Sequence, residues 1–369
     1  MLRLPLSLIA IAFLPAAARG QEVDVFAPAE VHRMMVLVND WQAAHPTMKP
    51  TDRNWERATW YTGVMAAYKA TRDPRFFDQA MAWGKAHQWQ VGTETSGSNR
   101  LFCVETWAEL YFETREKALI DPAIKWLDTP APNTPAGAKV WYFEDGRRYA
   151  DSLYGAPALA MLARATGNPK YIDTMNAFWQ DVSDEIFDRE EGLYYRDKRF
   201  IGQKSPAGRK VFWSRGNGWV MGGIVRVLEY LPEDEPTRVK YVDLLKTMSA
   251  AVAKRQGADG LWRPNLDDPD HVPFPESSGT GFFCYAMTWS LNHGILDRAA
   301  YEPVVRKAWK GLAGVVSPEG KVQWGQPVGD RPANVKESLT HEYVTGTLLL
   351  AGSEMYRLTG GKAVNSRDR

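Results

Sequence analysis

The stretch WSRGNGWVMGGIVRVLEYL, residues 213–231, opens on a polar and aromatic turn and continues as a helix dense in glycine and apolar side chains. A second helical pattern follows it, PTRVKYVDLLKTMSAAVAKR at residues 236–255, which is more amphipathic. Small side chains let helices pack closely in an interior, whereas an amphipathic helix suits a layer with one face in water. The two segments therefore predict a helical hairpin with one inner and one outer helix.

The same hairpin recurs along the chain. Similar blocks begin at Asp151, Trp213, Glu276 and Glu337, at spacings of 62, 63 and 61 residues. Amphipathic second helices are expected over 168–187, 236–255 and 297–316, each closed by a turn with a glycine and an aromatic residue. Another pair is expected over 55–89 and a weaker, shorter one over 103–127. The first helix, about Ala29–His45, pairs with the last, Leu339–Leu358. About twelve helices in six hairpins predict an all-α fold, an (α/α)6 toroid with inner and outer layers.

We expect residues 21–369 to form a single catalytic domain, because no interior linker interrupts the repeats. Residues 1–20 are typical of a signal peptide: Arg3 supplies the positive charge, an apolar run follows, and small residues near Ala18 offer a cleavage site. The apolar run is too short to span a membrane. The mature chain is therefore expected to be exported and soluble, with no membrane partner.

Composition excludes several classes of function. The chain has 44% hydrophobic and 24% charged residues and a net charge of +1, which is typical of a globular protein and unlike a nucleic-acid binder. The histidines and cysteines show no metal-ligand spacing, and no phosphate-binding loop is present, so neither a metal nor another cofactor is expected. Cys103 and Cys284 lie in apolar helical patterns, which favours buried free thiols over a disulfide.

The polar openings of the repeats predict a binding site. In a ring of hairpins the loops before the inner helices face one mouth, so these openings converge on one pocket. Trp213 and Trp219 could stack on a sugar, and the planar guanidinium of Arg215 could grip a carboxylate. Asn217, in a glycine-flanked turn, could donate to a hydroxyl or orient Asp151. The ligand expected from these residues is an acidic carbohydrate.

Four motifs, in this order and spacing, resemble the unsaturated glucuronyl and rhamnogalacturonyl hydrolases of glycoside hydrolase family 105. They are DSLY followed by a proline, WSRGNGW, ESSGT and EYVTGTLLLAGSE, and the resemblance covers most of the mature chain. It implies removal of the non-reducing-end 4,5-unsaturated uronic acid from lyase-generated oligosaccharides. The reaction implied is hydration of the C4=C5 vinyl ether. Such short substrates favour a periplasmic location.

The resemblance and the local chemistry both indicate Asp151 as the general acid and base. A proton donor must be neutral at the working pH, and aromatic neighbours such as Tyr149 and Tyr154 would raise the pKa of its carboxyl. The carboxylate left after proton transfer can then accept a proton from the attacking water. The alternative is that Asp151 caps a helix.

Further candidates for substrate binding come from the loops expected at the mouth. Glu276 could bind substrate or cap its helix, and Arg215 could instead form a salt bridge. The full substrate-binding set is Arg215, Trp213, Asn217, Trp219, Tyr154, Arg196, Glu276, Ser278, His341 and Tyr343, with Tyr195 and Ser277 as lesser candidates.

Two departures from the family pattern are visible. Where relatives commonly carry an acidic pair before a cysteine, this chain has Asn99-Arg100-Leu101 before Cys103, so that Asp52 or Glu105 would have to supply a second acid. Where some relatives have a histidine after the GLYY-type turn, this chain has Arg196-Asp197. The reaction class implied by the resemblance is compatible with these differences, but rhamnogalacturonan can no longer be assumed to be the source polymer.

Two other functions remain open from the sequence. An ordinary glycosidase acting on saturated uronides would need two carboxylates flanking the bond, roughly 6.5–9.5 Å apart in an inverting enzyme, such as Asp151 with Glu276 or Asp52. A non-catalytic acidic-sugar-binding protein of the same fold is the other. The source polysaccharide, the linkage and the choice between monomer and dimer are not fixed by the sequence.

Overall fold

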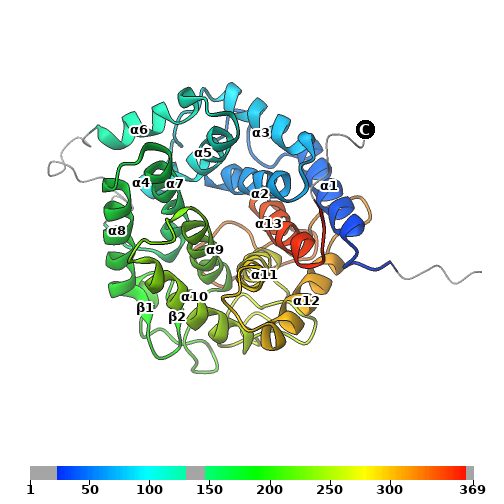
Figure 1. Ribbon diagram of the computed structural model, residues 1–369. Helices are drawn as coiled ribbons and strands as arrows, with labels where there is room; N and C mark the ends of the chain where they lie inside the picture. Colours follow the sequence, from blue (N-terminus) through cyan, green and yellow to red (C-terminus); the bar gives the residue numbers. More distant parts are fainter. Residues whose placement is uncertain (1–22, 130–145, 363–369) are drawn as a thin grey trace, which may run out of the picture.

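The computed structural model describes residues 23–129 and 146–362, whose helices form a ring in two layers (Figure 1). The inner helices are α2 (Trp55–Thr71), α5 (Phe102–Thr114), α7 (Pro157–Thr166), α9 (Ser214–Tyr230), α11 (Ser277–Asn292) and α13 (Glu342–Leu358). The outer helices are α1 (Pro28–Ala44), α3 (Pro74–Ala86), α6 (Asp121–Asp128), α8 (Lys170–Ile186), α10 (Arg238–Ala253) and α12 (Arg298–Gly314). The predicted (α/α)6 toroid is confirmed, whereas the predicted signal peptide lies outside the described residues.

The inner helices close on themselves. Each packs on the next in the order α2, α5, α7, α9, α11 and α13, and α13 packs back on α2. The first outer helix, α1, packs on α13, so the two ends of the described chain complete the last hairpin. The expected pairing of the first and last helices is therefore confirmed.

Small residues allow the closest approach between inner helices. A Cβ atom placed on Gly63 of α2 would lie 2.4 Å from the carbonyl oxygen of Gly346 on α13, and one on Gly346 would lie 2.3 Å from that of Thr59. A Cβ on Gly222 of α9 would likewise lie 2.8 Å from the ring of Phe282 on α11. These distances are shorter than any ordinary carbon contact, so this packing requires glycine.

The sequence pattern predicted one continuous helix in the block that begins at Asp151, and this prediction was wrong. A 3-10 turn, η2 (Ala150–Gly155), comes first, and α7 begins only at Pro157. Proline lacks an N–H and has a fixed φ, so it suits the first position of a helix and separates the turn from α7. Asp151 consequently lies in a tight turn at the mouth of the ring.

The remaining elements are short and lie in the connections. They are α4 (Gly97–Arg100), η1 (Lys117–Leu119), η3 (Lys198–Phe200), and the antiparallel strands β1 (Phe187–Asp188) and β2 (Leu193–Tyr194), in which Phe187 pairs with Tyr194. This hairpin confirms the turn expected at its glycine. The last inner helix starts at Glu342, three residues later than expected.

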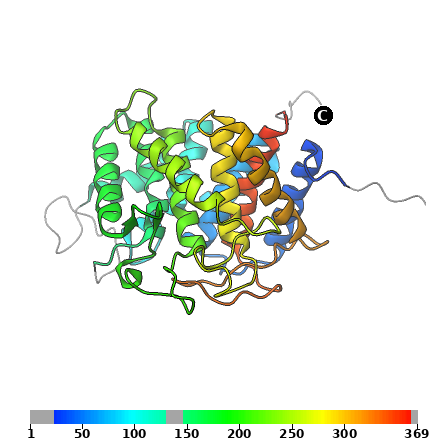
Figure 2. The ribbon, with the colours of Figure 1, turned by 90° about the horizontal axis from the view of Figure 1, so that it is seen from below.

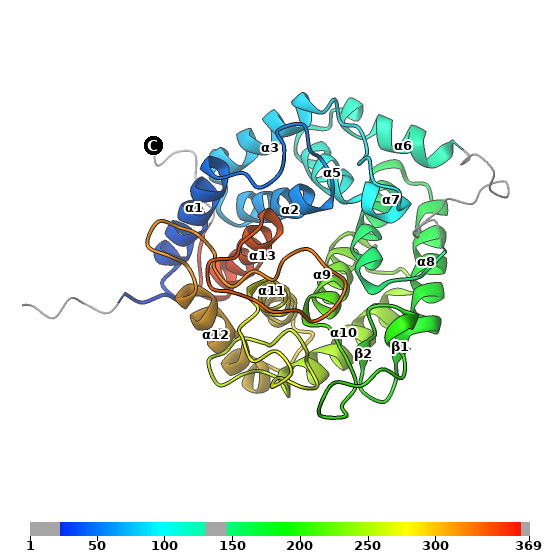
Figure 3. The ribbon, with the colours of Figure 1, turned by 180° about the vertical axis from the view of Figure 1, so that it is seen from behind.

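The longer loops gather at one end of the ring (Figure 2). In Figure 3 the segment between α12 and α13 crosses this face. Within the part of the chain that the structure describes, no helix is long and apolar enough to cross a membrane. Cys103 and Cys284 are buried and free, as expected.

Candidate active site

A cavity of about 390 Å³ opens at the end of the ring where the inner helices begin. It is lined by aromatic, charged and polar side chains and by one loop: Trp55, Phe102, Tyr149, Trp213, Trp219, Glu94, Asp151, Arg196, Arg215, Thr95, Asn99, Val328 and Gly329. Five of the predicted site residues therefore meet in one place, namely Asp151, Arg196, Trp213, Arg215 and Trp219.

Backbone pairing places Asp151 in the cavity wall. Tyr149 forms an antiparallel bridge with Asp197, and the amide of Ala150 donates to the carbonyl of Arg196 at 2.8 Å. This pairing brings the turn before α7 against the segment that follows β2. Asp151 and Arg196, 45 residues apart in the sequence, become neighbours as a result.

Few groups stabilise the ionised form of the Asp151 carboxyl. Its Oδ2 lies 3.5 Å from Nη2 of Arg196, and its Oδ1 is buried without a hydrogen-bond partner among the described residues. Burial raises the pKa of Asp151 above its ordinary value, although Arg196 and Arg215 act in the opposite direction. Among the described residues the Asp151 side chain accepts a hydrogen bond from Arg196 and none from an amide that follows it in its turn, so the structure does not support the capping alternative.

Arg215 lines the cavity, but its guanidinium already has partners. Nη1 donates to the carbonyl of Gln326 at 2.6 Å and to the hydroxyl of Tyr343 at 3.2 Å, and Nη2 donates to the carbonyl of Pro327 at 2.8 Å. Trp213 reinforces the same attachment, since its indole N–H donates to Oε1 of Gln326 at 2.9 Å. Arg215 and Trp213 therefore fix the loop whose tip, at residues 328–329, lines the cavity.

Aromatic rings form the floor of the cavity. Trp219 lies edge-on to Trp55 with ring centres 5.8 Å apart, and it packs on Phe102 and on Phe282. Tyr154 packs beneath Trp219 with ring centres 4.9 Å apart, is fully buried and is not among the residues that line the cavity. Tyr154 therefore supports the floor and does not contact a ligand there, which corrects the expectation for this residue.

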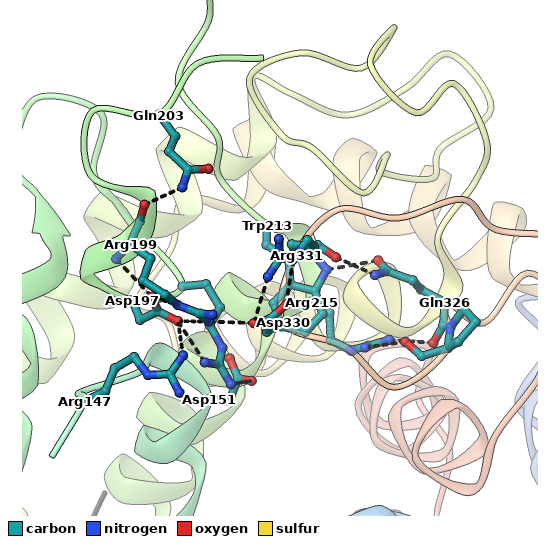
Figure 4. A network of polar contacts seen from close by, with 12 residues as sticks. Arg147, Asp151, Asp197, Arg199, Gln203, Trp213, Arg215, Gln326, Asp330 and Arg331 are labelled. Atoms are coloured by element: carbon teal, nitrogen blue, oxygen red, sulfur yellow. Dashed lines mark hydrogen bonds and ion pairs between the residues drawn. The ribbon is translucent and has the colours of Figure 1, made fainter. Parts of the chain in front are cut away.

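Arg196 belongs to a chain of charged residues that continues through Asp197, Arg199 and Asp330, which Figure 4 labels. Its Nη1 donates to Oδ2 of the buried Asp197 at 2.9 Å, and its guanidinium lies over the ring of Tyr149. Arg199 contacts Asp197 at 2.7 Å and Asp330 at 2.5 Å. The chain thus links the cavity loop to the neighbourhood of Asp151.

The side chain of Asn217 forms hydrogen bonds to the backbone within the described residues. Its side-chain oxygen accepts from the amide of Tyr194 at 2.8 Å, and its side-chain nitrogen donates to the carbonyls of Tyr194 and Trp213. It does not belong to the cavity lining. The expectation that Asn217 contacts substrate or orients Asp151 is replaced by a role in holding β2 to the start of α9.

Glu276 and Ser278 also lie outside the cavity lining. The carboxylate of Glu276 caps α11, accepting from the amides of Ser278 at 3.0 Å and Gly279 at 2.6 Å, and it accepts from the Ser278 hydroxyl as well. It also accepts from the amide of Gln326 at 3.3 Å. Of the two roles considered for Glu276, the structure shows the cap.

The residues at the start of α13 support the cavity from behind. His341 accepts from the amide of Glu342 and stacks on Tyr343, and burial lowers the pKa of His341 to about 4. The hydroxyl of Tyr343 donates to the carbonyl of Gln326, and its ring stacks on Trp55. Neither His341 nor Tyr343 is among the lining residues, and the same holds for Tyr195, which bonds to Asp188.

The cavity contains an acidic residue that the sequence reasoning missed, Glu94. Its Oε1 accepts from the amide of Trp55 at 2.7 Å, its Oε2 is buried without a partner among the described residues, and burial raises its pKa to about 8. The residues proposed for a second acid lie elsewhere: Asp52 accepts from the amide of Asn54, and Glu105 is fully buried against Arg226. Glu94 is not part of any recognisable motif. The only sequence signal is that it precedes an inner helix, in one of the loops expected at the mouth of the ring.

Asn99, Tyr149 and Trp55 were also not among the predicted site residues. The hydroxyl of Tyr149 donates to Oδ1 of Asn99 at 2.7 Å and contacts the hydroxyl of Ser96 at 2.6 Å. Asn99 therefore lies in the cavity wall close to Tyr149. Within residues 23–129 and 146–362, no group of three histidine, cysteine or acidic side chains could hold a metal ion.

Comparison with known proteins identifies the family. A model described as Glycosyl Hydrolase Family 88 matches residues 29–359. A relative from Formosa agariphila, named unsaturated 3S-rhamnoglycuronyl hydrolase, is 32% identical over 352 residues, 89% of this chain and 91% of the relative. A solved structure described as a polysaccharide lyase is 31% identical, covers 92% of this chain and 99% of that one, and superposes with a TM-score of 0.81.

A second solved structure shows the breadth of the fold. It comes from Salmonella enterica, is described as a possible member of the GH105 family, and has a TM-score of 0.74 at 22% identity over 95% of this chain and 100% of that one. The resemblance found in the sequence motifs is thus confirmed at the level of the family. The chain is a glycoside hydrolase and belongs to Glycosyl Hydrolase Family 88.

Proposed function

We propose that the protein removes a terminal 4,5-unsaturated uronic acid from lyase-generated oligosaccharides by hydrating the C4=C5 vinyl ether. The observation that carries this proposal is the Asp151 carboxyl, which lies in the cavity with an unpartnered buried oxygen and a raised pKa. A carboxyl in this setting keeps its proton at a pH at which an ordinary aspartate has lost it. The name of the Formosa relative supports an unsaturated uronide linked to a rhamnose-type sugar as the substrate.

The chemistry follows from that proton. Asp151 donates it to C4, the double-bond electrons form the new C–H bond, and the positive charge that develops at C5 is shared with the ring oxygen. Water adds at C5 and gives its proton to the Asp151 carboxylate, which restores the acid. The product is a hemiketal, which opens and releases the rest of the oligosaccharide, so that one residue serves both steps without a cofactor.

The cavity walls suit the charge and the ring of this substrate. Arg196 and Arg215 line the same cavity as Asp151, and a uronate carboxylate bound between them would bring the sugar ring to the proton donor. Trp55, Trp213 and Trp219 offer flat apolar faces to the sugar. The site therefore combines cationic groups for the carboxylate, aromatic walls for the ring and a neutral acid for C4.

An ordinary two-carboxylate glycosidase is the second candidate, and one observation favours it: Glu94 shares the cavity with Asp151. The pairs considered from the sequence are not supported, because Glu276 is engaged as a helix cap and Asp52 is not among the cavity residues. A glycosidase of this type would cleave saturated uronides, which a vinyl-ether hydratase leaves intact.

The deciding measurement is the ultraviolet absorbance of the unsaturated uronate, followed with wild type and Asp151→Asn on a panel of lyase-generated oligosaccharides. We expect wild type to remove the absorbance and Asp151→Asn to be slower by about 10²–10⁴-fold or more, the usual contribution of a general acid or base. Near-wild-type turnover by Asp151→Asn would remove this residue from the mechanism. Rising absorbance on intact polymer would indicate a lyase, and cleavage of saturated uronides an ordinary glycosidase.

We also propose that the protein is exported to the periplasm. This rests on the charged, apolar and small-residue pattern of residues 1–20 and on the short length of lyase products. Cell fractionation of the full chain beside a variant lacking residues 2–20 tests it. Equal distribution of the two proteins between periplasm and cytoplasm would contradict the proposal.

A further inference from the structure

The dipeptide Arg196-Asp197, one of the two departures from the family pattern, lies directly beside the proposed proton donor. The carboxylate of Asp197 has no exposed surface and is surrounded by arginines. Arg199 contacts it through Nε at 2.8 Å and Nη2 at 2.7 Å, Arg196 through Nη1 at 2.9 Å, and Arg147 approaches to 3.8 Å. Burial acts to raise the pKa of Asp197, but hydrogen bonds from Arg199 and Arg196 bring it below its ordinary value, so this carboxylate stays charged.

Arg196 lies between two carboxyls and is bonded unequally to them. Its contact with Asp197 is 2.9 Å, whereas its contact with Asp151 is 3.5 Å, at the limit of a hydrogen bond. A guanidinium held at 2.9 Å by one carboxylate cannot also approach the second one closely without moving. The geometry therefore leaves Asp151 close to a positive charge but without a firm ion pair.

We propose that Asp197 is a positioning residue for the proton donor: by holding Arg196, it prevents this arginine from closing an ion pair with Asp151. An aspartate that forms a full ion pair with arginine stays ionised near neutral pH and cannot donate a proton. This inference rests on the proposed role of Asp151 and deepens it. Asp197 has no part in the reaction scheme itself, so its contribution would be made through Arg196.

Several other charged and titratable groups within residues 23–129 and 146–362 face these two carboxyls. Asp151 faces Arg196, the more distant charge of Arg215, and the hydroxyl-bearing ring of Tyr149. Asp197 faces Arg147, Arg196 and Arg199. Asp330 contacts Arg199 at 2.5 Å and Arg331 at 2.8 Å, so it joins the network through Arg199.

The experiment compares the pH dependence of kcat/KM for wild type, Asp197→Asn, Arg196→Gln and the double variant. The proton donor must be protonated, so activity falls as the pH rises through the pKa of Asp151. In Asp197→Asn the charge that draws Arg196 away from Asp151 is removed. Arg196 then pairs more closely with Asp151, and we expect this decline about 1–3 pH units lower, the usual effect of an adjacent arginine. In Arg196→Gln we expect the decline in activity at higher pH than in wild type. KM can change as well, because Arg196 lines the cavity.

The double variant separates this role from a merely structural one. If Asp197 acts only through Arg196, the double variant follows the pH profile of Arg196→Gln alone. Asp330→Asn is the matched control, because it removes the other carboxylate from Arg199, and its decline should stay at the wild-type pH. A further shift on adding Asp197→Asn to Arg196→Gln, or an unchanged profile in Arg196→Gln, would overturn the proposal.

A direct titration keeps the inference testable apart from activity. Carboxyl infrared difference spectra between each protein and its Asp151→Asn counterpart report the protonation of Asp151 without substrate. We expect a lower midpoint in the Asp197→Asn background and a higher one in the Arg196→Gln background. If Asp151→Asn remains active, the proposed function fails while these midpoints still decide the coupling. If Asp197→Asn does not fold, Asp197→Gln takes its place in these titrations, and a midpoint equal to that of wild type would overturn the proposal.

Discussion

At the scale of single residues, Arg215 shows how one guanidinium can serve both the fold and the site. Two of its nitrogens hold the carbonyls of Gln326 and Pro327, and the guanidinium lies over the rings of Trp213 and Tyr343 at 4.6 and 4.9 Å. Arg215 also lines the cavity. Lysine could not replace it, because a single ammonium lacks the planar fork that reaches both carbonyls.

We expect Arg215→Ala to raise KM by about 10–100-fold, the equivalent of one or two lost charge-assisted hydrogen bonds, and to lower the melting temperature. Steady-state kinetics and thermal unfolding on the same preparation separate the two roles. Arg331→Ala is the control for a nearby charge, since the Arg331 side chain is 58% exposed and its ion pair is with the adjacent Asp330. A lower melting temperature with unchanged KM would show that Arg215 only anchors the loop.

At the scale of elements, helical periodicity predicted the hairpins because it records which face of each helix is buried. The break at Pro157 was visible in the same letters, since a proline prefers the first turn of a helix. The pairing of Tyr149 with Asp197 was not predictable, because no local pattern records which distant loop a turn will meet. Glu94 was missed for the same reason: its chemistry comes from burial against Trp55, which only the folded chain creates.

The contact between α2 and α13 offers a test of the inner layer. A Cβ on Gly346 would lie 2.3 Å from the carbonyl oxygen of Thr59, so Gly346→Val must push the two helices apart. We expect it to reduce the free energy of unfolding by about 1–3 kcal/mol or more, as overpacking a core does. Gly314→Ala, at the end of α12, is the control: nothing lies within 4 Å of its Cβ position, so stability should be unchanged or slightly higher. Equal stability of Gly346→Val and wild type in urea would refute the close packing.

At the scale of the whole molecule, a buried ionic cluster joins three hairpins inside the ring. Arg226 of α9 has no exposed surface and pairs with Glu105 and Glu109 of α5, while Lys69 of α2 contacts Glu109 at 2.8 Å and Glu229 at 2.7 Å. Burial raises the pKa of Glu105 to about 7 even with Arg226 beside it. The inner layer therefore buries charged groups, and the charges of this cluster must balance for the helices to close.

Removing the cation from this cluster should make stability strongly dependent on pH. We expect Arg226→Met to lower the free energy of unfolding by about 3–5 kcal/mol near neutral pH, because Glu105 loses its buried partner and Glu109 keeps only Lys69. A buried glutamate with a raised pKa is neutral in the fold but ionises on unfolding above its ordinary pKa. Each such group therefore lowers stability by about 1.4 kcal/mol per pH unit as the pH rises from that value toward the raised one.

The loss in Arg226→Met should accordingly shrink as the pH falls toward 4.5, the ordinary pKa of Glu105. Urea unfolding at several pH values measures it, and adding Glu105→Gln to Arg226→Met should remove most of the pH dependence. Lys117→Met is the control, because Lys117 pairs with Asp121 on the surface with 72% of its side chain exposed, where an ion pair contributes about 0–1 kcal/mol. A loss of equal size at every pH would mean that Arg226 stabilises the ring by packing, and that the charge of the glutamates does not limit closure.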